Sequence, residues 1–123
     1  MLSLTVLSQF IHPDNMGADR TKTSSILASV GMAAARFHED YGQFSEGDSR
    51  TIMLQLRGMN PRKTVYFHAP VGEEPGLIIP KDAWDRDIIC LVPSNSTFVV
   101  RSFGANGRDE GGAGDDLRFS LAR

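Results

Sequence analysis

The sequence predicts one α+β domain in which a long N-terminal helix packs on a small antiparallel sheet. Apolar residues follow helical spacing in the first half of the chain, whereas short β-prone runs separated by Gly, Pro and Asn fill the second half. Helices first and strands afterwards are typical of α+β domains. A length of 123 residues, 41% hydrophobic and 23% charged, is enough for a single domain with a modest core.

The chain opens with a segment rich in turn formers. Residues 12–17 read His-Pro-Asp-Asn-Met-Gly, and Pro, Asp, Asn and Gly favour turns over regular structure. We therefore expect residues 1–17 to be a leader or linker and residues 18–123 to form the globular domain.

A first helix is predicted from Ala18 or Asp19 to about Asp40. Its apolar residues recur three and four apart and define one face, which comprises Ile26, Leu27, Val30, Ala33, Ala34 and Phe37. The residues expected on its other faces are Lys22, Thr23, Ser29, Arg36 and Glu39. Gly42 follows Tyr41 and can take the left-handed conformation that ends many helices.

Two further features belong to the helical half. Gly31 lies inside the first helix, where glycine costs about 1 kcal/mol relative to alanine. Either another element packs closely there or the glycine occurs by chance. A second, short helix is predicted with Asp48 or Ser49 as its N-cap and Gly58 at its end.

The second half contains runs that are typical of strands. Four of them follow Pro61, at residues 64–68, 77–79, 87–92 and 97–102. The polar connection at 92–97 predicts an antiparallel hairpin between residues 88–91 and 98–100. A last alternating run at 117–121 is expected either to return along the sheet or to pack on the helix.

The loop between Ser102 and Asp116 is the most informative part of the chain for function. It contains five glycines and four carboxylates between two apolar runs. Glycine lets the backbone turn so that carbonyl and carboxylate oxygens converge, and hard cations such as Ca²⁺ bind such oxygens. The composition alone leaves two interpretations open, a calcium-stabilised loop and a flexible polar surface turn.

Two known calcium motifs do not account for this loop. Residues 111–116 fit the Gly-Gly-x-Gly-x-Asp start of a β-roll nonapeptide, but Arg118 stands where a large apolar residue is needed, and there is one copy only. An EF-hand requires a bidentate glutamate at the twelfth loop position, and no Asp-rich stretch here has one.

Composition argues against several other function classes. A net charge of −2 with scattered arginines gives no basic surface for nucleic acid. The single cysteine, Cys90, lies in an apolar run, so there is no internal disulfide and no Cys-based zinc site, and we expect a buried thiol. No stretch of roughly 20 apolar residues predicts a membrane-spanning helix, and the chain as given is expected to be soluble.

Catalytic motifs are also missing from the sequence. It has no Gly-x-Ser-x-Gly elbow, no phosphate-binding glycine loop and no His-Glu-x-x-His zinc pair. His38 is expected to act as a favourable cation at a helix C-terminus, and His68 to lie at a strand end. Three acidic residues around Trp84 are expected to form a solvated turn beside a core tryptophan; they are Asp82, Asp85 and Asp87.

Three segments, taken in order, resemble the globular domain of type II secretion pseudopilins. Asp40-Tyr-Gly-Gln-Phe44 is similar to the family's Asp-x-Gly-x-Tyr-Pro segment, and Asp82-Ala-Trp-Asp-Arg86 to its Asp-x-Trp-Gly-x-Pro segment. The run from Phe98 to Gly107, followed by Gly-Gly-Ala-Gly-Asp-Asp-Leu, resembles the closing strand, the Ser-x-Gly-x-Asp-Gly loop and the Asp-Asp-Ile ending. The resemblance covers about residues 19 to 120 and points to the major pseudopilin, a relative of type IV pilins that forms a short periplasmic filament.

The resemblance implies a calcium site in the loop. The implied ligands are the side chains of Asn106, Asp115 and Asp116 with the carbonyl oxygens of Phe103 and Arg108. Asn106 stands where the family has aspartate, so one negative charge is lost and weaker binding is expected, because charge count tunes such sites. Asp109 or Glu110 could restore that charge.

Other departures concern turns and the N-terminus. Asp85 replaces a family glycine, while Asp87 and Ser45 replace prolines. A pseudopilin begins with a basic leader and a long apolar helix that anchors it in the membrane, and the sequence given has neither. We therefore expect either the soluble part of a longer protein, with residues 1–10 as the tail of that helix, or a free-standing relative.

The resemblance implies a non-catalytic structural subunit of a periplasmic secretion filament. Its partners would be other pseudopilin subunits and the secretion machinery, and contact with the membrane would come only through the missing N-terminal helix. The alternative is a stand-alone soluble binding module that reuses the scaffold. A small hydrolase without a recognisable motif is the third hypothesis, and a pocket lined by titratable residues would favour it.

Overall fold

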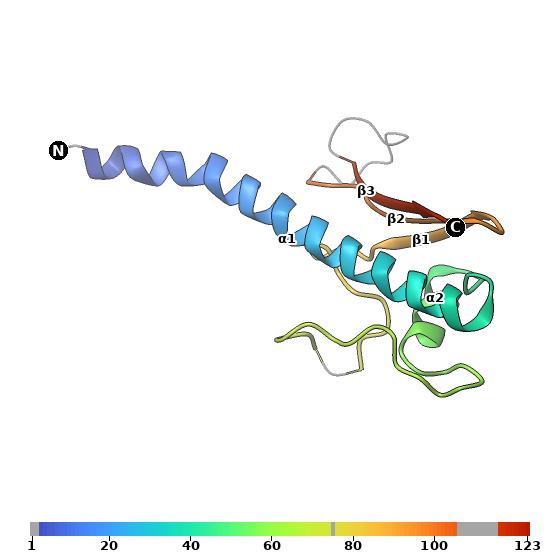
Figure 1. The fold of residues 1–123 in the computed structure, drawn as a ribbon. Coiled ribbons are helices and arrows are strands. Elements are labelled where there is room, and N and C mark those ends of the chain that lie inside the picture. The colour runs from blue at the N-terminus through green and yellow to red at the C-terminus, as the bar shows by residue number, and fades with distance from the viewer. Residues whose placement is uncertain (1–2, 75, 106–115) are drawn as a thin grey trace.

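The protein, described by a computed structural model, contains two helices and one three-stranded sheet within residues 3–74, 76–105 and 116–123, with side chains described from Gly17 onward. The elements follow in the order α1 (Ser3–Tyr41), α2 (Ser49–Leu56), β1 (Ile89–Ser94), β2 (Thr97–Ser102) and β3 (Leu117–Ala122). The sheet has the order β1-β2-β3, and α1 contacts β2 and β3 (Figure 1). The predicted α+β class, with one long helix on a small antiparallel sheet, is confirmed.

Both neighbouring strand pairs are antiparallel. Cys90 pairs with Val100 in the predicted hairpin, and Val100 pairs with Phe119 on its other side. β1 extends to Ser94, so the hairpin turn is shorter than the polar connection suggested. The last run both returns along the sheet as β3 and packs on α1, which joins the two alternatives left open by its sequence pattern.

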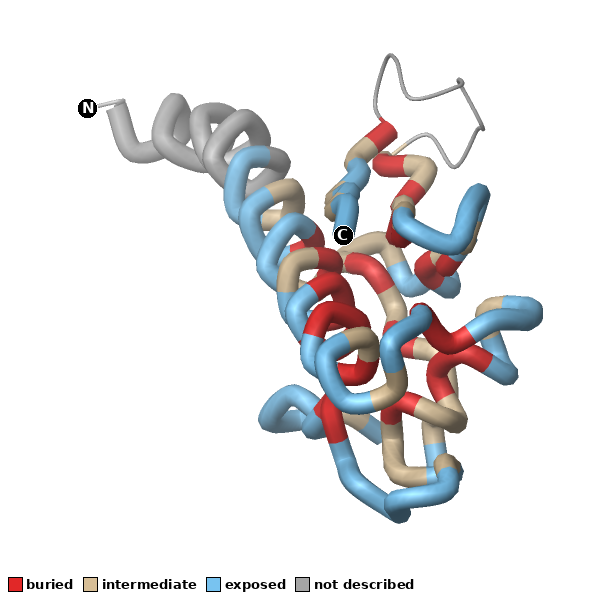
Figure 2. The backbone as a smooth tube through the Cα atoms, turned by 45° about the vertical axis from the view of Figure 1, so that its right-hand side comes forward, coloured by how far each residue is buried: buried red, intermediate tan, exposed pale blue. Residues whose placement is uncertain are grey.

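The core lies between α1, α2 and the sheet. The predicted apolar face of α1 is buried, with Ile26 only partly so, and it meets buried residues of the strands and of α2 (Figure 2). Fully buried side chains from elsewhere in the chain include Phe44, Ile52, Met53, Leu56 and Phe98. Cys90 is 2% exposed, so the predicted buried thiol is confirmed.

Two predictions about α1 are wrong. Residues 12–17 do not form the predicted turn, because α1 begins at Ser3 and includes them. The N-terminal part of α1 extends beyond the sheet (Figure 1). Local turn preference is a weak prior that a continuing helix can override. Thr23 is fully buried rather than outward-facing, and its Oγ1 accepts a hydrogen bond from the Ala83 amide at 3.0 Å, which makes burial of a hydroxyl possible.

The helix ends are as their sequences predict. Gly42 has a φ of 73° and its amide donates to the His38 carbonyl oxygen at 2.8 Å, which closes α1. Asp48 caps α2, since its Oδ1 accepts from the Thr51 amide at 2.8 Å. That hydrogen bond lowers the pKa of Asp48.

Two of the predicted strands do not form. Residues 64–68 are irregular because the amides of Tyr66 and Phe67 both donate to the Leu56 carbonyl oxygen, at 2.8 and 2.9 Å, and so pair with the end of α2. Residues 77–79 are also irregular, and the Arg57 Nε donates to the Ile78 carbonyl oxygen at 2.8 Å. Tertiary partners therefore satisfy backbone groups that a sheet would otherwise satisfy.

No helix in the described part of the chain combines the length and the apolar character needed to cross a membrane.

Candidate functional site

The base of the loop between β2 and β3 is set by the register of these two strands. The last pair of the ladder is Ser102 with Leu117, so Phe103 and Asp116 are the first residues beyond it on the two arms. Opposite residues in an antiparallel pair lie about 5 Å apart at their Cα atoms. Two of the five implied ligands, Phe103 and Asp116, are thus brought together, whereas Asn106, Arg108 and Asp115 lie outside the described residues.

Asp116 is held on the second arm by an ion pair. Its Oδ2 lies 3.2 Å from Nη2 of Arg101, and its side chain is 1% exposed against 17% for that of the arginine. The Arg101 guanidinium also lies over the Phe103 ring, 5.4 Å from the centroid. One arginine on β2 therefore contacts the first residue of each arm.

The first arm is held by the turn at residues 82–86. The Ser102 hydroxyl donates to Oδ2 of Asp82 at 2.7 Å and accepts from the Gly104 amide at 3.1 Å. Nη1 of Arg86 donates to the Gly104 carbonyl oxygen at 2.9 Å. This arm is thus fixed by side chains that precede it by almost 20 residues.

Asp82 organises that turn from inside the protein. Its Oδ1 accepts from the amides of Trp84 and Arg86 at 2.9 and 3.0 Å, and the residue is only 5% exposed. The prediction of a solvated acidic turn is therefore wrong for Asp82, although Asp85 is exposed as expected. Asp82 can be buried because its carboxylate accepts three hydrogen bonds, which replace those it would make with water.

The residues around the loop base are compatible with a hard cation. Carboxylate, amide and main-chain carbonyl oxygens are the ligands that Ca²⁺ prefers. A carboxylate offers about four lone-pair directions, so Asp116 can bind a guanidinium and a cation together. Among the residues that the structure describes, no group of three or more His, Cys, Asp or Glu side chains could hold a metal.

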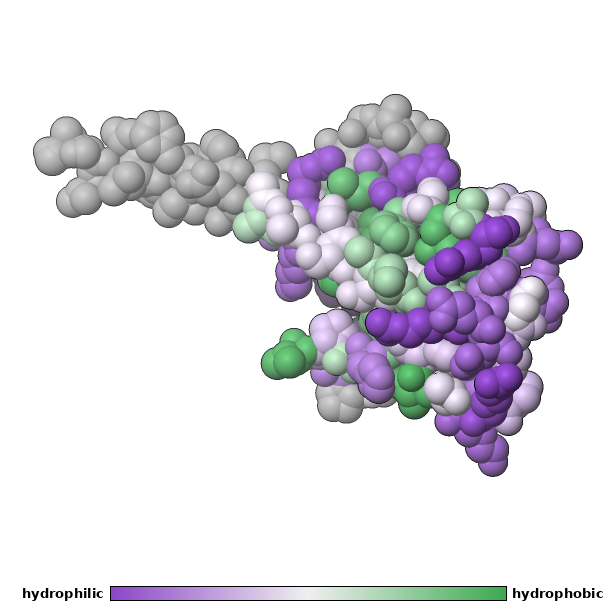
Figure 3. Space-filling view, viewed as in Figure 1, coloured by the Kyte–Doolittle hydropathy of each residue, from purple (hydrophilic) through white to green (hydrophobic). Residues whose placement is uncertain are grey.

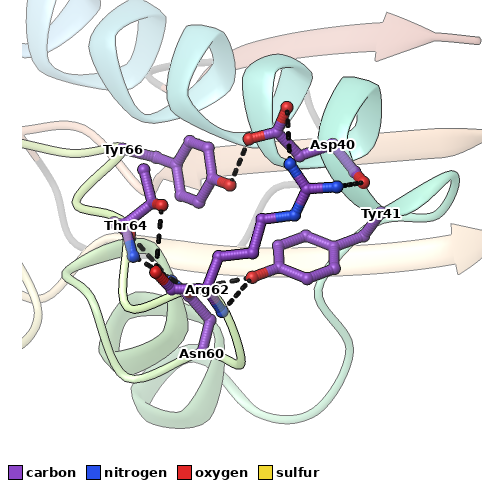
Figure 4. A network of polar contacts seen from close by, with 6 residues as sticks. All are labelled: Asp40, Tyr41, Asn60, Arg62, Thr64 and Tyr66. Carbon is purple, nitrogen blue, oxygen red and sulfur yellow. Dashed lines mark hydrogen bonds and ion pairs between the residues drawn. The ribbon is translucent and has the colours of Figure 1, made fainter.

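A second polar network joins the end of α1 to residues 60–66 (Figure 4). The Tyr66 hydroxyl donates to Oδ2 of Asp40 at 2.5 Å, and the Tyr41 hydroxyl donates to Oδ1 of Asn60 at 2.9 Å. Arg62 donates its amide to the Tyr41 hydroxyl and its Nη2 to the Asp40 carbonyl oxygen. Burial, and then the hydrogen bond to Asp40, raise the pKa of Tyr66 to about 12.

This second network has the character of a structural connection. It satisfies a helix-terminal carbonyl and fixes a segment that has no regular secondary structure.

Two histidines lie outside this network. The His38 ring packs on Phe44, with the ring centroids 4.6 Å apart. His68 is exposed on an irregular segment, so the predicted strand end at His68 is wrong.

A cleft of about 310 Å³ lies between α1 and the residues on either side of Pro80. Its walls include Lys22 and Lys81 as well as Glu74 and Asp85, so they carry charges of both signs. Glu73, also in the wall, forms an ion pair with Arg57 at 3.0 Å.

The surface of the domain is divided by polarity. On the face seen in Figure 3, hydrophobic residues gather in the middle and hydrophilic residues dominate the right-hand side.

The support that Asp82 and Ser102 give to the loop was not predicted from the sequence. Aspartate often accepts hydrogen bonds from backbone amides two or more residues ahead in turns, and Asp82 at the start of Asp-Ala-Trp-Asp-Arg carried that signal. No comparable local signal pairs it with Ser102, because that contact depends on how the turn docks against β2.

Comparison of the chain with protein-family profiles, with curated protein sequences and with solved structures gives no match.

Proposed function

We propose that this chain is a non-catalytic structural domain of the pseudopilin kind, with a calcium-stabilised loop between β2 and β3. It would serve as a subunit of a type II secretion filament in the periplasm, with other pseudopilin subunits and the secretion machinery as partners. The three resembling segments, rather than any match to a known protein, support this proposal.

The hydrogen bond between Ser102 and Asp82 is the observation on which the proposal mainly rests. It joins the second resembling segment to the third at 2.7 Å, although they lie about 20 residues apart in the chain. Asp85 has a φ of 63°, a left-handed conformation that favours glycine, and the family has glycine at the matching position. The first segment ends α1 at Gly42, where φ is 73°.

The proposed ion would be held by the carbonyl oxygens of Phe103 and Arg108 and by the side chains of Asn106, Asp115 and Asp116. A bound Ca²⁺ would supply the positive charge that draws these oxygens together. The strand register supports this proposal, because Phe103 and Asp116 are the first residues beyond the last strand pair, one on each arm.

A stand-alone binding module is the second candidate, and the cleft beside α1 favours it. Lysines and carboxylates line the same cavity of about 310 Å³, which suits a small ligand or peptide that carries both charges. In this function the loop would be a structural feature without a role in assembly.

Thermal unfolding in calcium and in chelator tests the proposed ion. With free Ca²⁺ at about 100 times Kd, the free energy of unfolding should rise by roughly 2.7 kcal/mol. Asp115→Ala should abolish the increase, whereas Glu46→Ala, which removes an exposed carboxylate outside the loop, should preserve it. Identical unfolding curves in calcium and in chelator would refute the calcium site.

Sedimentation over a range of protein concentrations separates the two candidates. A filament subunit should self-associate more strongly when Ca²⁺ is present than when it is chelated. A protein that stays monomeric in both conditions at high concentration would favour the binding module.

A further inference from the structure

We infer that the outer edge of β3 is a docking site for an extended peptide segment that carries an acidic residue opposite Arg118. β3 lies at one edge of the sheet, because the strand order is β1-β2-β3 (Figure 1). The inference goes beyond the proposed function and needs neither a bound ion nor a filament. It rests on described residues of the sheet and of the start of α2.

The hydrogen-bond pattern of the ladder shows which backbone groups of β3 point away from β2. The Arg123 amide donates to the Ser96 carbonyl oxygen at 2.7 Å, in register with the β2–β3 pairs. Hydrogen-bonded pairs alternate along antiparallel strands, so the odd-numbered residues of β3 direct N–H and C=O to β2 and the even-numbered ones direct theirs outward. The outward residues are Arg118, Ser120 and Ala122. Within the described residues, no backbone group pairs with them on that side.

The opposite edge of the sheet, formed by β1, is protected. The Cys90 amide donates to the Ser49 Oγ at 3.0 Å, at the start of α2. β1 also contains Pro93, and its register with β2 shifts in the same stretch. A covering element, a proline and an irregular register are means by which proteins prevent strand addition. β3 contains no proline and keeps one register with β2 throughout, so an added strand is expected at β3 rather than at β1.

Charge on the outer face of β3 selects an acidic partner. Arg118 lies opposite Arg101 in a non-hydrogen-bonded pair, where side chains are close. Asp116 forms an ion pair with Arg101 at 3.2 Å, whereas exposed Arg118 has no ion pair among the described residues. Like charges opposite each other are unfavourable in a sheet, and opposite charges are favourable. A carboxylate on an added strand beside Arg118 would therefore stabilise the pairing.

The inner face of β3 requires apolar side chains from the same partner. Leu117, Phe119 and Leu121 pack against the core but are only partly buried. Side chains alternate between the two faces of a strand, so a segment that places acidic or polar residues on the outer face can place apolar residues beside these three. The partner is thus an extended segment in which apolar residues alternate with polar ones.

A second copy of β3 is a less suitable partner than an acidic segment. Residues 117–123 include Arg118 and Arg123 but no acidic side chain. Pairing two copies at this edge would bring like charges together, whereas an acidic segment brings the opposite charge.

The first test compares two blocked peptides for binding to the full chain. The probe Thr-Val-Ser-Val-Glu-Val-Ser, in antiparallel register with Ala122 first, places its glutamate opposite Arg118 and its valines on the inner face. The control peptide has lysine in place of the glutamate. Titration calorimetry should show that the control binds about fivefold more weakly, and Arg118→Glu should reverse the preference. No binding of the glutamate peptide at millimolar concentration, or equal binding of both peptides, would overturn the inference.

Backbone methylation of the probe tests the hydrogen bonds without altering the protein. In the stated register the third peptide residue directs its N–H toward Ser120, whereas the fourth directs its N–H away from β3. N-methylation at the third residue should weaken binding by about tenfold, and N-methylation at the fourth should leave it within about twofold. Equal effects at both positions would contradict strand addition.

Ser120→Pro removes one outward N–H from the protein, and Ser120→Thr is its matched control. Proline is tolerated on an edge strand where the N–H faces solvent, so circular dichroism should show an unchanged fold. Ser120→Pro should weaken peptide binding by at least about tenfold, whereas Ser120→Thr should bind within about twofold of the wild type. Wild-type affinity in Ser120→Pro would overturn the inference.

Hydrogen exchange followed by NMR tests the edge before any peptide is added. The outward amides of Arg118, Ser120 and Ala122 should exchange at least about tenfold faster than those of Phe119 and Leu121, and the glutamate peptide should slow them. Equal protection of both sets in the free protein would mean that the edge is already covered and would overturn the inference. Sedimentation that detects a dimer abolished by Ser120→Pro would assign the edge to a second copy instead. These results do not depend on calcium, so the inference and the proposed function can fail separately.

Discussion

Replacing Gly31 with alanine tests the contact that holds α1 on the sheet. A Cβ atom at this position would lie 2.2 Å from both Cδ2 and Cε2 of Phe119 on β3. Nonbonded carbons are comfortable at about 3.5 to 4.0 Å, so the ring would have to retreat by more than about 1 Å. Of the two explanations that the sequence left open for Gly31, close packing of another element is the one that the structure supports.

Two opposing terms set the size of the effect. Alanine favours the helix over glycine by about 1 kcal/mol, whereas forcing extra atoms into a packed contact typically costs about 1 to 3 kcal/mol. Two ring atoms are contacted and Phe119 is fixed in register opposite Val100, so we place the packing cost near the upper end. Gly31→Ala should therefore lower the free energy of unfolding by about 1 to 2 kcal/mol.

A double-mutant cycle with Phe119→Ala isolates the contact. Once the ring is removed, only the helix preference remains, and Gly31→Ala should stabilise the Phe119→Ala protein by up to about 1 kcal/mol. Urea unfolding followed by circular dichroism gives all four free energies. If Gly31→Ala stabilises the wild-type background as well, the ring moves away without cost and the reasoning about this interface is wrong. Phe119→Leu serves if the alanine variant does not fold.

Four further predictions concern the core and the loop base. Arg101→Ala should lower the free energy of unfolding, measured by chemical denaturation, by about 3 kcal/mol, because it removes the guanidinium that pairs with the buried Asp116 carboxylate. A decrease of less than about 1 kcal/mol would contradict this prediction. Thr23→Val should lower the free energy of unfolding by about 1 kcal/mol, because valine has almost the shape of threonine but offers no acceptor to the Ala83 amide. An unchanged melting temperature would contradict this prediction. Burial raises the pKa of Cys90 from 9.0 to about 12, so the native thiol should resist alkylation at pH 8 and react only after unfolding. The native state keeps a proton that the unfolded chain loses above its own pKa, so stability should fall as pH rises from about 9 toward 12, and Cys90→Ala should flatten that fall.

The sequence was sufficient for features whose physical cause is local. The apolar spacing of α1, the left-handed glycine at its end and the aspartate cap of α2 each act within a few residues, and all three are present. The hairpin of β1 and β2 is similarly local. These local elements are sufficient to predict the α+β class without knowledge of any long-range contact.

Other features depend on partners that are distant in the chain. Residues 64–68 have strand-like composition, but the Leu56 carbonyl oxygen accepts from the amides of Tyr66 and Phe67 and keeps the segment out of the sheet. Thr23 looks like a surface residue until Ala83 is brought beside it. A pattern of residue types cannot express such pairings, because they follow from how the turns dock after the helices and strands have formed.

The loop base is held to α1 at two separate places, one for each arm. The first arm is connected through Ser102, Asp82 and the turn to Thr23, and the second through β3 and Phe119 to Gly31. Eight residues separate the two contacts on α1, which is about 12 Å along a helix axis. Variants at that separation usually have additive effects on stability, so non-additivity of Thr23→Val and Gly31→Ala would mean that α1 and the loop base move as one unit.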